Sequence, residues 1–214
     1  MTRVSRAWVL ASRNAGKLRE LRSLFAAHGV QVMDLREAGI AEDAVAESGI
    51  EAFDTFEANA LAKARYFSAR LPGRIVVADD SGLEVEALRG APGVRSKRWS
   101  EATHKDGLTL EAENNRLLVS AMSGQHNRNA RFVCAAAWCD GALELVARGV
   151  VAGAIIDEPL GNHGFGYDAH VFVGELGRTM AEASLVEKGT VSHRGRAFTA
   201  LLATVRDHHG GRLM

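Results

Sequence analysis

Hydrophobic positions along the chain change between the spacing of strands and the spacing of helices. The segment from Ala7 to Ala11 is continuously apolar and predicts a buried strand. A polar turn follows, and apolar residues then recur every three or four positions, which predicts a helix: Leu18, Leu21, Leu24 and Phe25. Alternation from Val30 to Leu35 predicts the next strand. This order is typical of a sheet whose strands are joined through helices.

The middle of the chain carries a second predicted helix and the most apolar predicted strand. After the acidic stretch from Glu37 to Glu51, one face of this helix consists of Phe53, Phe56, Ala60, Ala64 and Phe67. Leu71-Pro72-Gly73 is expected to end it. The run from Ile75 to Ala78 predicts a strand buried on both faces, and we expect it to end in a turn at 79–82. A polar helix is expected over 108–122.

A hairpin and a last helix complete the pattern. Asp140-Gly141 separates two strand-like segments, 131–139 and 142–147, and is the strongest hairpin signal in the chain. A further strand is expected at 169–173, and Ser192 is expected to cap the C-terminal helix. The pattern predicts an α/β fold with a twisted mixed sheet, organised as one domain over residues 1–214.

Composition narrows the class of protein. The 214 residues are 47% hydrophobic and 24% charged, as in soluble globular proteins with a sizeable core. The chain has 26 basic and 26 acidic residues, so an anion must be held by a local site rather than by a global field. The longest apolar run, Phe132 to Cys139, is far shorter than the roughly 20 residues of a membrane helix. We therefore expect a cytoplasmic protein that binds neither membrane nor nucleic acid.

The two cysteines, Cys134 and Cys139, lie five residues apart in one predicted strand. Because side chains alternate along a strand, the two thiols are expected on opposite faces, where they cannot pair. No Cys or His cluster in the sequence has the spacing of a metal site. Both cysteines are expected to be small core residues in a reducing compartment.

The polar turn from Ser12 to Lys17, between a strand and a helix, is the first candidate site. Free backbone N–H groups and the positive end of a helix dipole attract phosphate, and Lys17 adds a charge. The turn is not a Walker A loop, because it has one glycine and Leu18 follows the lysine. A polar turn with a surface lysine is the alternative.

The second candidate is Asp79-Asp80-Ser81-Gly82, directly after the buried strand. Open α/β sheets bind ligands at the carboxyl ends of their strands. Adjacent carboxylates repel each other unless a proton or cation intervenes, and Mg²⁺ suits carboxylates and phosphates together. One of the two could also accept a proton from an attacking water. The alternative is a polar turn with a capping aspartate.

Two further candidates lie near the C-terminus. Phe165-Gly166-Tyr167-Asp168 offers aromatic faces for a base and a carboxylate, although core packing explains the aromatic residues equally well. Lys188 and Ser192-His193-Arg194 collect donors at a helix start, where a solvated basic turn is the alternative. A basic cluster, Arg95, Lys97 and Arg98 beside Trp99, is interpreted as a partly exposed loop.

Together these motifs, in their order and spacing, resemble the inosine triphosphate pyrophosphatases, enzymes that act on non-standard purine nucleoside triphosphates. The resemblance extends over nearly the whole chain. It is carried by the segments 11–17 with Glu20-Leu21, 47–49, Thr55-Phe56, Asn59-Ala60, 78–83, 90–93 with Arg98, 164–168, Glu187-Lys188 and 192–195.

The resemblance implies an elongated α/β fold with a long mixed sheet, two lobes around a nucleotide cleft, and a homodimer. It implies that Glu47 and Asp80 hold Mg²⁺, that Asp80 also activates water, and that Ser81 touches the substrate. The residues implied to hold the triphosphate are Ser12, Arg13, Asn14, Ala15, Gly16 and Lys17. Those implied to enclose the purine are Phe165, Gly166, Tyr167, Asp168, Lys188, His193 and Arg194. The implied reaction converts inosine, deoxyinosine or xanthosine triphosphate to the monophosphate and pyrophosphate.

The chain departs from the family pattern at three places. Ile50 to Asp54 resembles an insertion, and Ala58 stands where the family often has glutamate, so Glu57 is an alternative to Glu47 as second metal ligand. Ala169-His170 replaces the family's Pro-Ile. The rival functions are a pyrophosphatase for another modified or pyrimidine nucleotide, and a non-catalytic nucleotide- or nucleic-acid-binding module.

Overall fold

A seven-stranded mixed sheet forms the centre of the part of the chain that this computed structural model describes, residues 7–101, 108–211 and 213. The strand order is β2-β1-β3-β4-β5-β6-β7. The strands are β1 (Trp8–Leu10), β2 (Val32–Asp34), β3 (Val76–Val85), β4 (Asn129–Cys139), β5 (Glu144–Ile155), β6 (Val171–Val173) and β7 (Arg178–Thr179). β1 pairs in parallel with β2 and β3, and the remaining pairs are antiparallel. The expected α/β class, mixed sheet and hairpin are confirmed.

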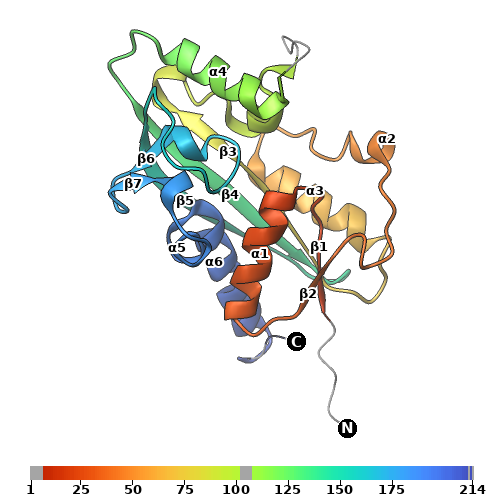
Figure 1. Cartoon of the computed structure of the whole chain (residues 1–214). Helices are drawn as coiled ribbons and strands as arrows, with labels where there is room; N and C mark the ends of the chain where they lie inside the picture. The colour runs from red at the N-terminus through yellow and green to blue at the C-terminus, as the bar shows by residue number, and fades with distance from the viewer. Residues whose placement is uncertain (1–6, 102–107, 212, 214) are drawn as a thin grey trace.

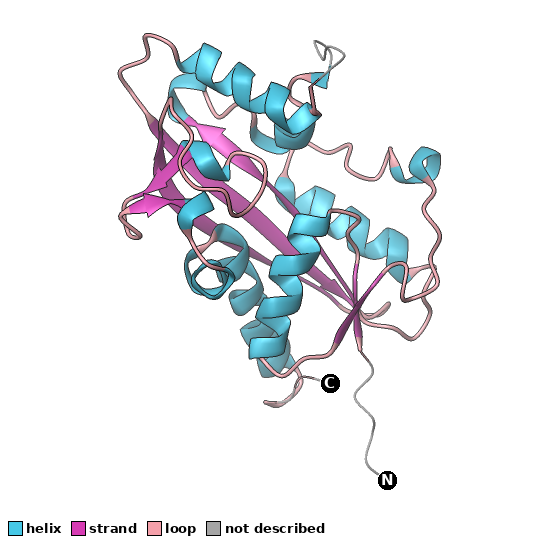
Figure 2. Cartoon of the chain, in the orientation of Figure 1, coloured by secondary structure: helices cyan, strands magenta, loops and turns pink. Residues whose placement is uncertain are grey.

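Helices cover both faces of this sheet (Figures 1 and 2). α1 (Ala15–Ala27) and α6 (His193–His208) bury their apolar sides on one face, and α3 (Phe56–Ser68) buries its apolar side on the other. α4 (Leu110–Met122) closes a third cluster at the far end of the sheet, while α5 (Leu185–Val191) precedes α6. None of the described helices is long and apolar enough to cross a membrane.

The cysteines follow the predicted alternation. Cys134 packs in the cluster beneath α1 and α6, and Cys139 in the cluster beneath α3. Both are free and buried. Opposite-facing thiols on β4 are therefore core residues.

The strand β3 does not end before the paired aspartates, so the expected turn at 79–82 is wrong. β3 continues to Val85, and Asp79 and Asp80 pair in register with Ala136 and Ala135 of β4. Polar residues persist in this strand because each side chain finds partners above or below the sheet. Asp79 meets residues of α1 and α6, whereas Asp80 meets Asn59 of α3. The strand therefore presents its two carboxylates to different layers.

The predicted helix after the acidic stretch also begins later than expected. Thr55 caps α3, and its hydroxyl accepts a hydrogen bond from the Ala58 N–H at 3.2 Å. Phe53 precedes this cap, is 52% exposed and is not part of the helix. The stretch before it contains one short helix, α2 (Ala44–Glu47). By contrast, Ser192 caps α6 as predicted, accepting from the Gly195 N–H at 3.0 Å.

The backbone of α6 packs directly against Gly149 of β5, and this close approach provides a test of the fold. A Cβ at this position would overlap the carbonyl oxygen of His193 and the backbone nitrogen of Ala197. Gly149→Ala is expected to cost about 1–3 kcal/mol, because backbone atoms cannot swing aside as a side chain can. At roughly 2–4 °C per kcal/mol, the Tm should fall by several degrees in a thermal melt. Gly174→Ala, where a Cβ meets nothing within 4 Å, is the control and should leave the Tm nearly unchanged.

Candidate functional site

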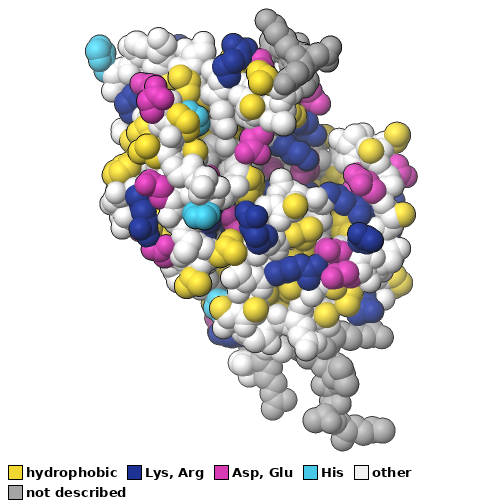
Figure 3. Space-filling model, in the orientation of Figure 1, with side chains coloured by type: hydrophobic (Ala, Val, Ile, Leu, Met, Phe, Trp, Pro, Cys, Tyr) yellow, Lys and Arg dark blue, Asp and Glu magenta, His cyan; other side chains and the backbone are white. Residues whose placement is uncertain are grey.

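A cleft of about 470 Å³ lies over the middle of β3 and falls within the usual range for small-molecule sites. Its walls come from segments far apart in the chain: the β1–α1 turn, the stretch before α3, the 3-10 helix η2 (Gly93–Arg98), α4, the loop at 165–168 and the start of α6. Figure 3 shows the hollow between α4 above and α1 below, with side chains of both charge signs gathered in it. This face is therefore suited to a charged ligand.

The predicted phosphate turn forms one end of the cleft. Two of its groups, the backbone N–H and the ammonium of Lys17, already have partners within the protein. The Asn14 side chain caps α1 by accepting from the Lys17 N–H at 2.9 Å, and the Lys17 ammonium lies 3.0 Å from Asp79 Oδ2. Ser12, Asn14 and Lys17 line the cleft. Gly16 instead lies against the Phe165 ring, where a Cβ would overlap the ring carbons. Glycine is required here for close packing of the two walls.

Arg13, also in this turn, lines the cleft but bonds elsewhere. Its guanidinium donates to both carboxylate oxygens of Glu47, at 2.7 and 3.2 Å. It also donates to the carbonyl oxygens of Ile40 and Ala41. Ala15 is not among the residues that line the cleft.

Asp79 lies at the centre of a buried ion cluster beneath the cleft. Its Oδ2 atom accepts from Arg194 Nε at 3.2 Å in addition to the contact with Lys17. Arg194 also donates to Glu20 at 2.6 Å and to the Ser81 hydroxyl at 2.8 Å. Burial alone would raise the pKa of Asp79, but Lys17 and Arg194 outweigh it and hold that pKa far below its usual range. Asp79 therefore stays ionised and ties α1 and α6 to β3.

Asp80, the predicted catalytic residue, lies on the other side of the strand and is 7% exposed. Asn59 Nδ2 donates to Asp80 Oδ2 at 2.9 Å, and the Ser81 N–H donates to Oδ1 at 2.9 Å. Burial raises the pKa of Asp80, and Glu51 raises it further against the opposing effect of Lys17. A carboxylate held in this way has a high affinity for a proton or a cation.

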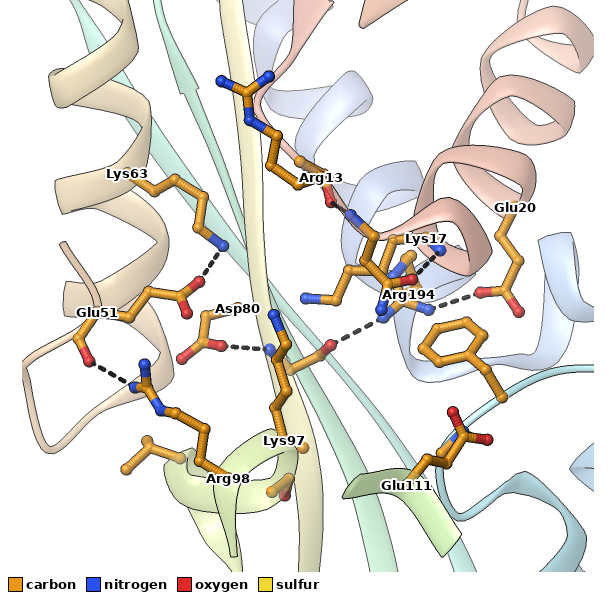
Figure 4. Close-up of a pocket in the computed structure, with 18 of the residues that line it drawn as sticks. Arg13, Lys17, Glu20, Glu51, Lys63, Asp80, Lys97, Arg98, Glu111 and Arg194 are labelled. Carbon is orange, nitrogen blue, oxygen red and sulfur yellow. Dashed lines mark hydrogen bonds and ion pairs between the residues drawn. The ribbon is translucent and has the colours of Figure 1, made fainter. Parts of the chain in front are cut away.

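Glu51 is the second carboxylate at this place, and the sequence interpretation did not select it. Its side chain pairs with Lys63 of α3, and its backbone carbonyl accepts from Arg98 at 3.3 Å (Figure 4). Figure 4 shows Glu51 and Asp80 pointing toward one another, with Lys63 beside Glu51. The stretch 50–54, expected to be an insertion, thus supplies a cleft residue. The sequence did contain a signal for this part of the site. Asn59 and Lys63 are four residues apart and share one face of α3, and they bind Asp80 and Glu51 respectively.

The two glutamates that the sequence favoured as metal ligands have other partners. Glu47 lines the cleft, but its carboxylate is paired with Arg13. Glu57 pairs with Arg148 at 3.1 Å and is not among the lining residues. The structure brings Glu51, rather than Glu47 or Glu57, opposite Asp80, and the charge of Glu51 raises the pKa of Asp80. Sequence spacing alone did not distinguish among Glu47, Glu51 and Glu57, which lie within eleven residues.

The wall that adjoins the predicted phosphate turn contains the residues expected around the purine, and it is called the base end of the cleft below. Lys188 is 3% exposed and contacts Asp168 at 2.6 Å and Glu20 at 3.2 Å, so it is not a solvated surface lysine. The Tyr167 hydroxyl donates to the Ser96 carbonyl at 2.9 Å. Phe165 and Gly166 line the cleft beside them. These residues form a pre-ordered wall.

His193 lies beneath this wall and stacks on Phe132, with ring centroids 4.9 Å apart. Burial and the neighbouring Arg194 lower the pKa of His193 well below its ordinary value, so the ring is neutral at pH 7. Its Nδ1 atom is buried and has no hydrogen-bond partner among the described residues. His193 therefore carries an unpartnered polar atom within the wall of the cleft.

The basic cluster that was interpreted as a loop is part of the cleft wall. Lys97 and Arg98 lie on η2 and line the cavity, whereas Arg95 on the same helix does not (Figure 4). Sequence reasoning missed Lys97. Its only signal was its place among three basic residues, which does not reveal which of them face inward.

Fold and cleft together define an α/β protein with a deep, highly charged ligand cleft on a mixed sheet. The chain belongs to the Ham1 family, which it matches over residues 8–204. It is 44% identical over 198 residues to the dITP/XTP pyrophosphatase of Burkholderia pseudomallei, covering 91% of each chain. It is 44% identical over 201 residues to the enzyme of the same name from Chromobacterium violaceum, covering 92% of this chain and 96% of that one.

Solved structures show the same similarity. The Staphylococcus aureus Ham1 protein matches with a TM-score of 0.75 and 32% identity, covering 95% of this chain and 100% of that one. A nucleoside-triphosphatase, dITP/XTP pyrophosphatase, from Mycobacterium abscessus matches with a TM-score of 0.66 and 40% identity, covering 92% and 99%. The resemblance seen in the motifs is confirmed over the length of the fold.

The ion cluster generates a stability prediction. Asp79→Asn removes the buried counter-charge that Lys17 and Arg194 share and leaves only Glu20 beside Arg194, which is expected to cost about 3–5 kcal/mol. The pKa of Asp79 is lower in the folded state than in the unfolded state. Its contribution to the free energy of unfolding is therefore fully present above the unfolded-state pKa of about 3.9, and it is lost progressively as the pH falls below that value. In thermal melts, the wild-type advantage over Asp79→Asn should be constant from pH 5 to 7 and shrink below pH 4. An advantage that stayed constant down to pH 3 would contradict this account.

Proposed function

We propose that this protein hydrolyses non-standard purine nucleoside triphosphates, namely the triphosphates of inosine, deoxyinosine and xanthosine, to the monophosphate and pyrophosphate. The observation that carries the proposal is the pair Asp80 and Glu51, facing one another in a cleft that also contains Lys17 and Lys63. Such a site combines carboxylates for a metal ion and a proton with cations for phosphates. The similarity to enzymes named dITP/XTP pyrophosphatases supports the substrate class.

We propose that Asp80 and Glu51 hold Mg²⁺. Two carboxylates fit this ion, because Mg²⁺ in nucleotide sites is usually held by one or two carboxylates together with substrate phosphates and water. Burial, and after it the charge of Glu51, raise the pKa of Asp80, and a bound cation would oppose both effects by stabilising the ionised carboxylate. When bound, the ion neutralises charge on the phosphates and acts as a Lewis acid.

The remaining chemistry belongs to the chain. Asp80 accepts a proton from the water that attacks the α-phosphorus, and pyrophosphate leaves with the electrons of the broken bond. Lys17 and Lys63 lie on either side of β3 and stabilise the charge that spreads over the phosphate oxygens. Asn59 orients the Asp80 carboxylate, which restricts it to the reacting side of the strand.

The base end of the cleft supports the choice of purine. Phe165 supplies an aromatic face, and Arg194 lies 5.5 Å from the centre of its ring. Donors at this end suit the 6-oxo group of hypoxanthine or xanthine and oppose the 6-amino group of adenine. A buried donor left unpaired costs on the order of 1–3 kcal/mol. The base is therefore proposed to bind at the wall formed by 165–168, Lys188, His193 and Arg194.

Four further parts of the proposal concern the protein as a whole. We propose a cytoplasmic homodimer that cleanses the nucleotide pool and has no nucleic-acid partner. The bacterial relatives bear the names of nucleotide-directed enzymes, which supports this setting. Sedimentation analysis of the purified protein tests the dimer directly.

The function is tested with a nucleotide panel. Pyrophosphate release is expected from inosine, deoxyinosine and xanthosine triphosphates with Mg²⁺ present, at kcat/KM values at least about tenfold above those for adenosine triphosphate, as expected for one to two unpaired donors. Excess chelator should abolish turnover. Preference for a pyrimidine triphosphate, or release of single phosphates instead of pyrophosphate, would refute the proposal.

The two carboxylates are tested separately. Asp80→Asn removes a positioned base and is expected to lower kcat by ~10²- to 10⁴-fold even at saturating Mg²⁺. Glu51→Gln should mainly raise the Mg²⁺ concentration required, so that added metal restores part of the rate. Glu57→Gln, on the adjoining α3 but outside the cleft, is the control and should behave like the wild type. Recovery of Asp80→Asn by added Mg²⁺ alone would show that Asp80 does not act as the base.

A further inference from the structure

Arg13 occupies the turn expected to hold phosphate, yet its side chain is directed to another segment. Its Nε and one terminal nitrogen donate to the two Glu47 oxygens at 3.2 and 2.7 Å. The terminal nitrogens also donate to the carbonyl oxygens of Ile40 at 3.2 Å and Ala41 at 2.8 Å. A guanidinium has five N–H groups, and these four bonds leave one for any other partner. The planar guanidinium of Arg13 therefore donates to the Glu47 carboxylate and to two backbone carbonyls of the same stretch of chain.

The segment that Arg13 binds, residues 41–54, is here called the arm. The arm contains α2 and projects from the body of the molecule beside the cleft (Figure 1). No arm residue is buried, and those that are only partly exposed are Glu47, Ile50 and Glu51. A segment with so little buried surface opens locally at low cost unless polar contacts hold it.

The arm carries Glu51 into the cleft. Its polar ties to the body come from two groups of residues: Arg13 binds Ala41 and Glu47, while Lys63, Arg98 and Asn59 bind Glu51 and Phe53. Glu47 precedes Glu51 by four residues, and the turn between them is closed by the bond from the Ile50 N–H to the Glu47 carbonyl. The position of Glu47 therefore limits the positions open to Glu51.

We infer that Arg13 and Glu47 form a clamp that fixes the arm against the phosphate end of the cleft and thereby positions Glu51 opposite Asp80. Both are positioning residues: Arg13 does not contact the substrate, and Glu47 does not contact the metal. The part of the inference that concerns Mg²⁺ rests on the proposed function. The part that concerns the arm does not.

The arm is tested first by hydrogen exchange in the protein without ligands. The informative amides are those of Glu47, Ser48 and Ile50, which bond within the arm. In Arg13→Ala and in Glu47→Gln these amides should exchange about 3- to 10-fold faster, and the double variant should be no faster than either single one, since one interaction is lost in each case. Arg65→Ala removes a comparable two-bond pair with Glu144 outside the cleft and should leave the arm unchanged. Unchanged exchange in both single variants would overturn the clamp.

Metal binding tests the consequence for Glu51. Calorimetric titration with Mg²⁺, in the presence of an inosine triphosphate analogue with an α,β-imido link, should show weaker binding by about 3- to 10-fold in both single variants. This is less than the 10- to 100-fold typical of groups bonded directly to a ligand, because the clamp acts four residues away. The activity at saturating Mg²⁺ should be nearly that of the wild type. The charge-reversed pair Arg13→Glu with Glu47→Arg should recover part of the lost affinity.

Two outcomes separate the clamp from its rival and from the proposed function. If Arg13 binds phosphate directly, Arg13→Ala will weaken binding of tripolyphosphate while Glu47→Gln, which frees the guanidinium, will not; that difference would overturn the inference. If the wild type does not hydrolyse inosine triphosphate, the proposed function fails, and the exchange experiment still decides whether the clamp holds the arm.

Discussion

The buried contact of Asp79 with Lys17 and Arg194 is the interaction on which the rest of this structure depends. It joins the first helix, the central strand and the last helix at one point. Three charged groups survive away from water because each finds an opposite charge, and Glu20 balances the second cation. The same contact brings the two ends of the described chain together beneath the cleft. Glu20 of α1 adds a second tie, because its carboxylate binds Arg194 at 2.6 Å, and the two ion pairs together fix the start of α6 relative to α1 and β3.

The pleat of β3 divides structural from chemical roles. Asp79 points toward α1 and α6 and is held ionised, while its neighbour Asp80 points toward α3 and has a raised pKa. Adjacent residues of a strand face opposite sides, so one backbone places two carboxylates in opposite electrostatic environments. A one-residue shift in the register with β4 would exchange them. The long antiparallel pairing of β3 with β4 prevents that shift.

The cleft combines rigid and weakly anchored walls. β3, α3 and α6 are packed into the main clusters, and they carry Asp80, Lys63 and Arg194. The stretch that carries Glu51 has no fully buried residue and depends on polar contacts with Arg13 and Lys63. A carboxylate on such a segment can adjust to a ligand at little cost in packing. Its position is consequently set by its charged neighbours rather than by the core.

The sequence by itself determined the local features of this protein: the polar turn before α1, the cap at Ser192, the Asp140-Gly141 hairpin, and Asp80 as a cleft residue in a family-specific motif. These depend on turn chemistry, capping and apolar periodicity, which act over a few residues. Only the tertiary structure decided that β3 continues through its aspartates, that Arg13 binds Glu47, and that Glu51 faces Asp80. Each of these depends on contacts between residues far apart in the chain, and three nearby glutamates are equivalent until the fold assigns each its partner.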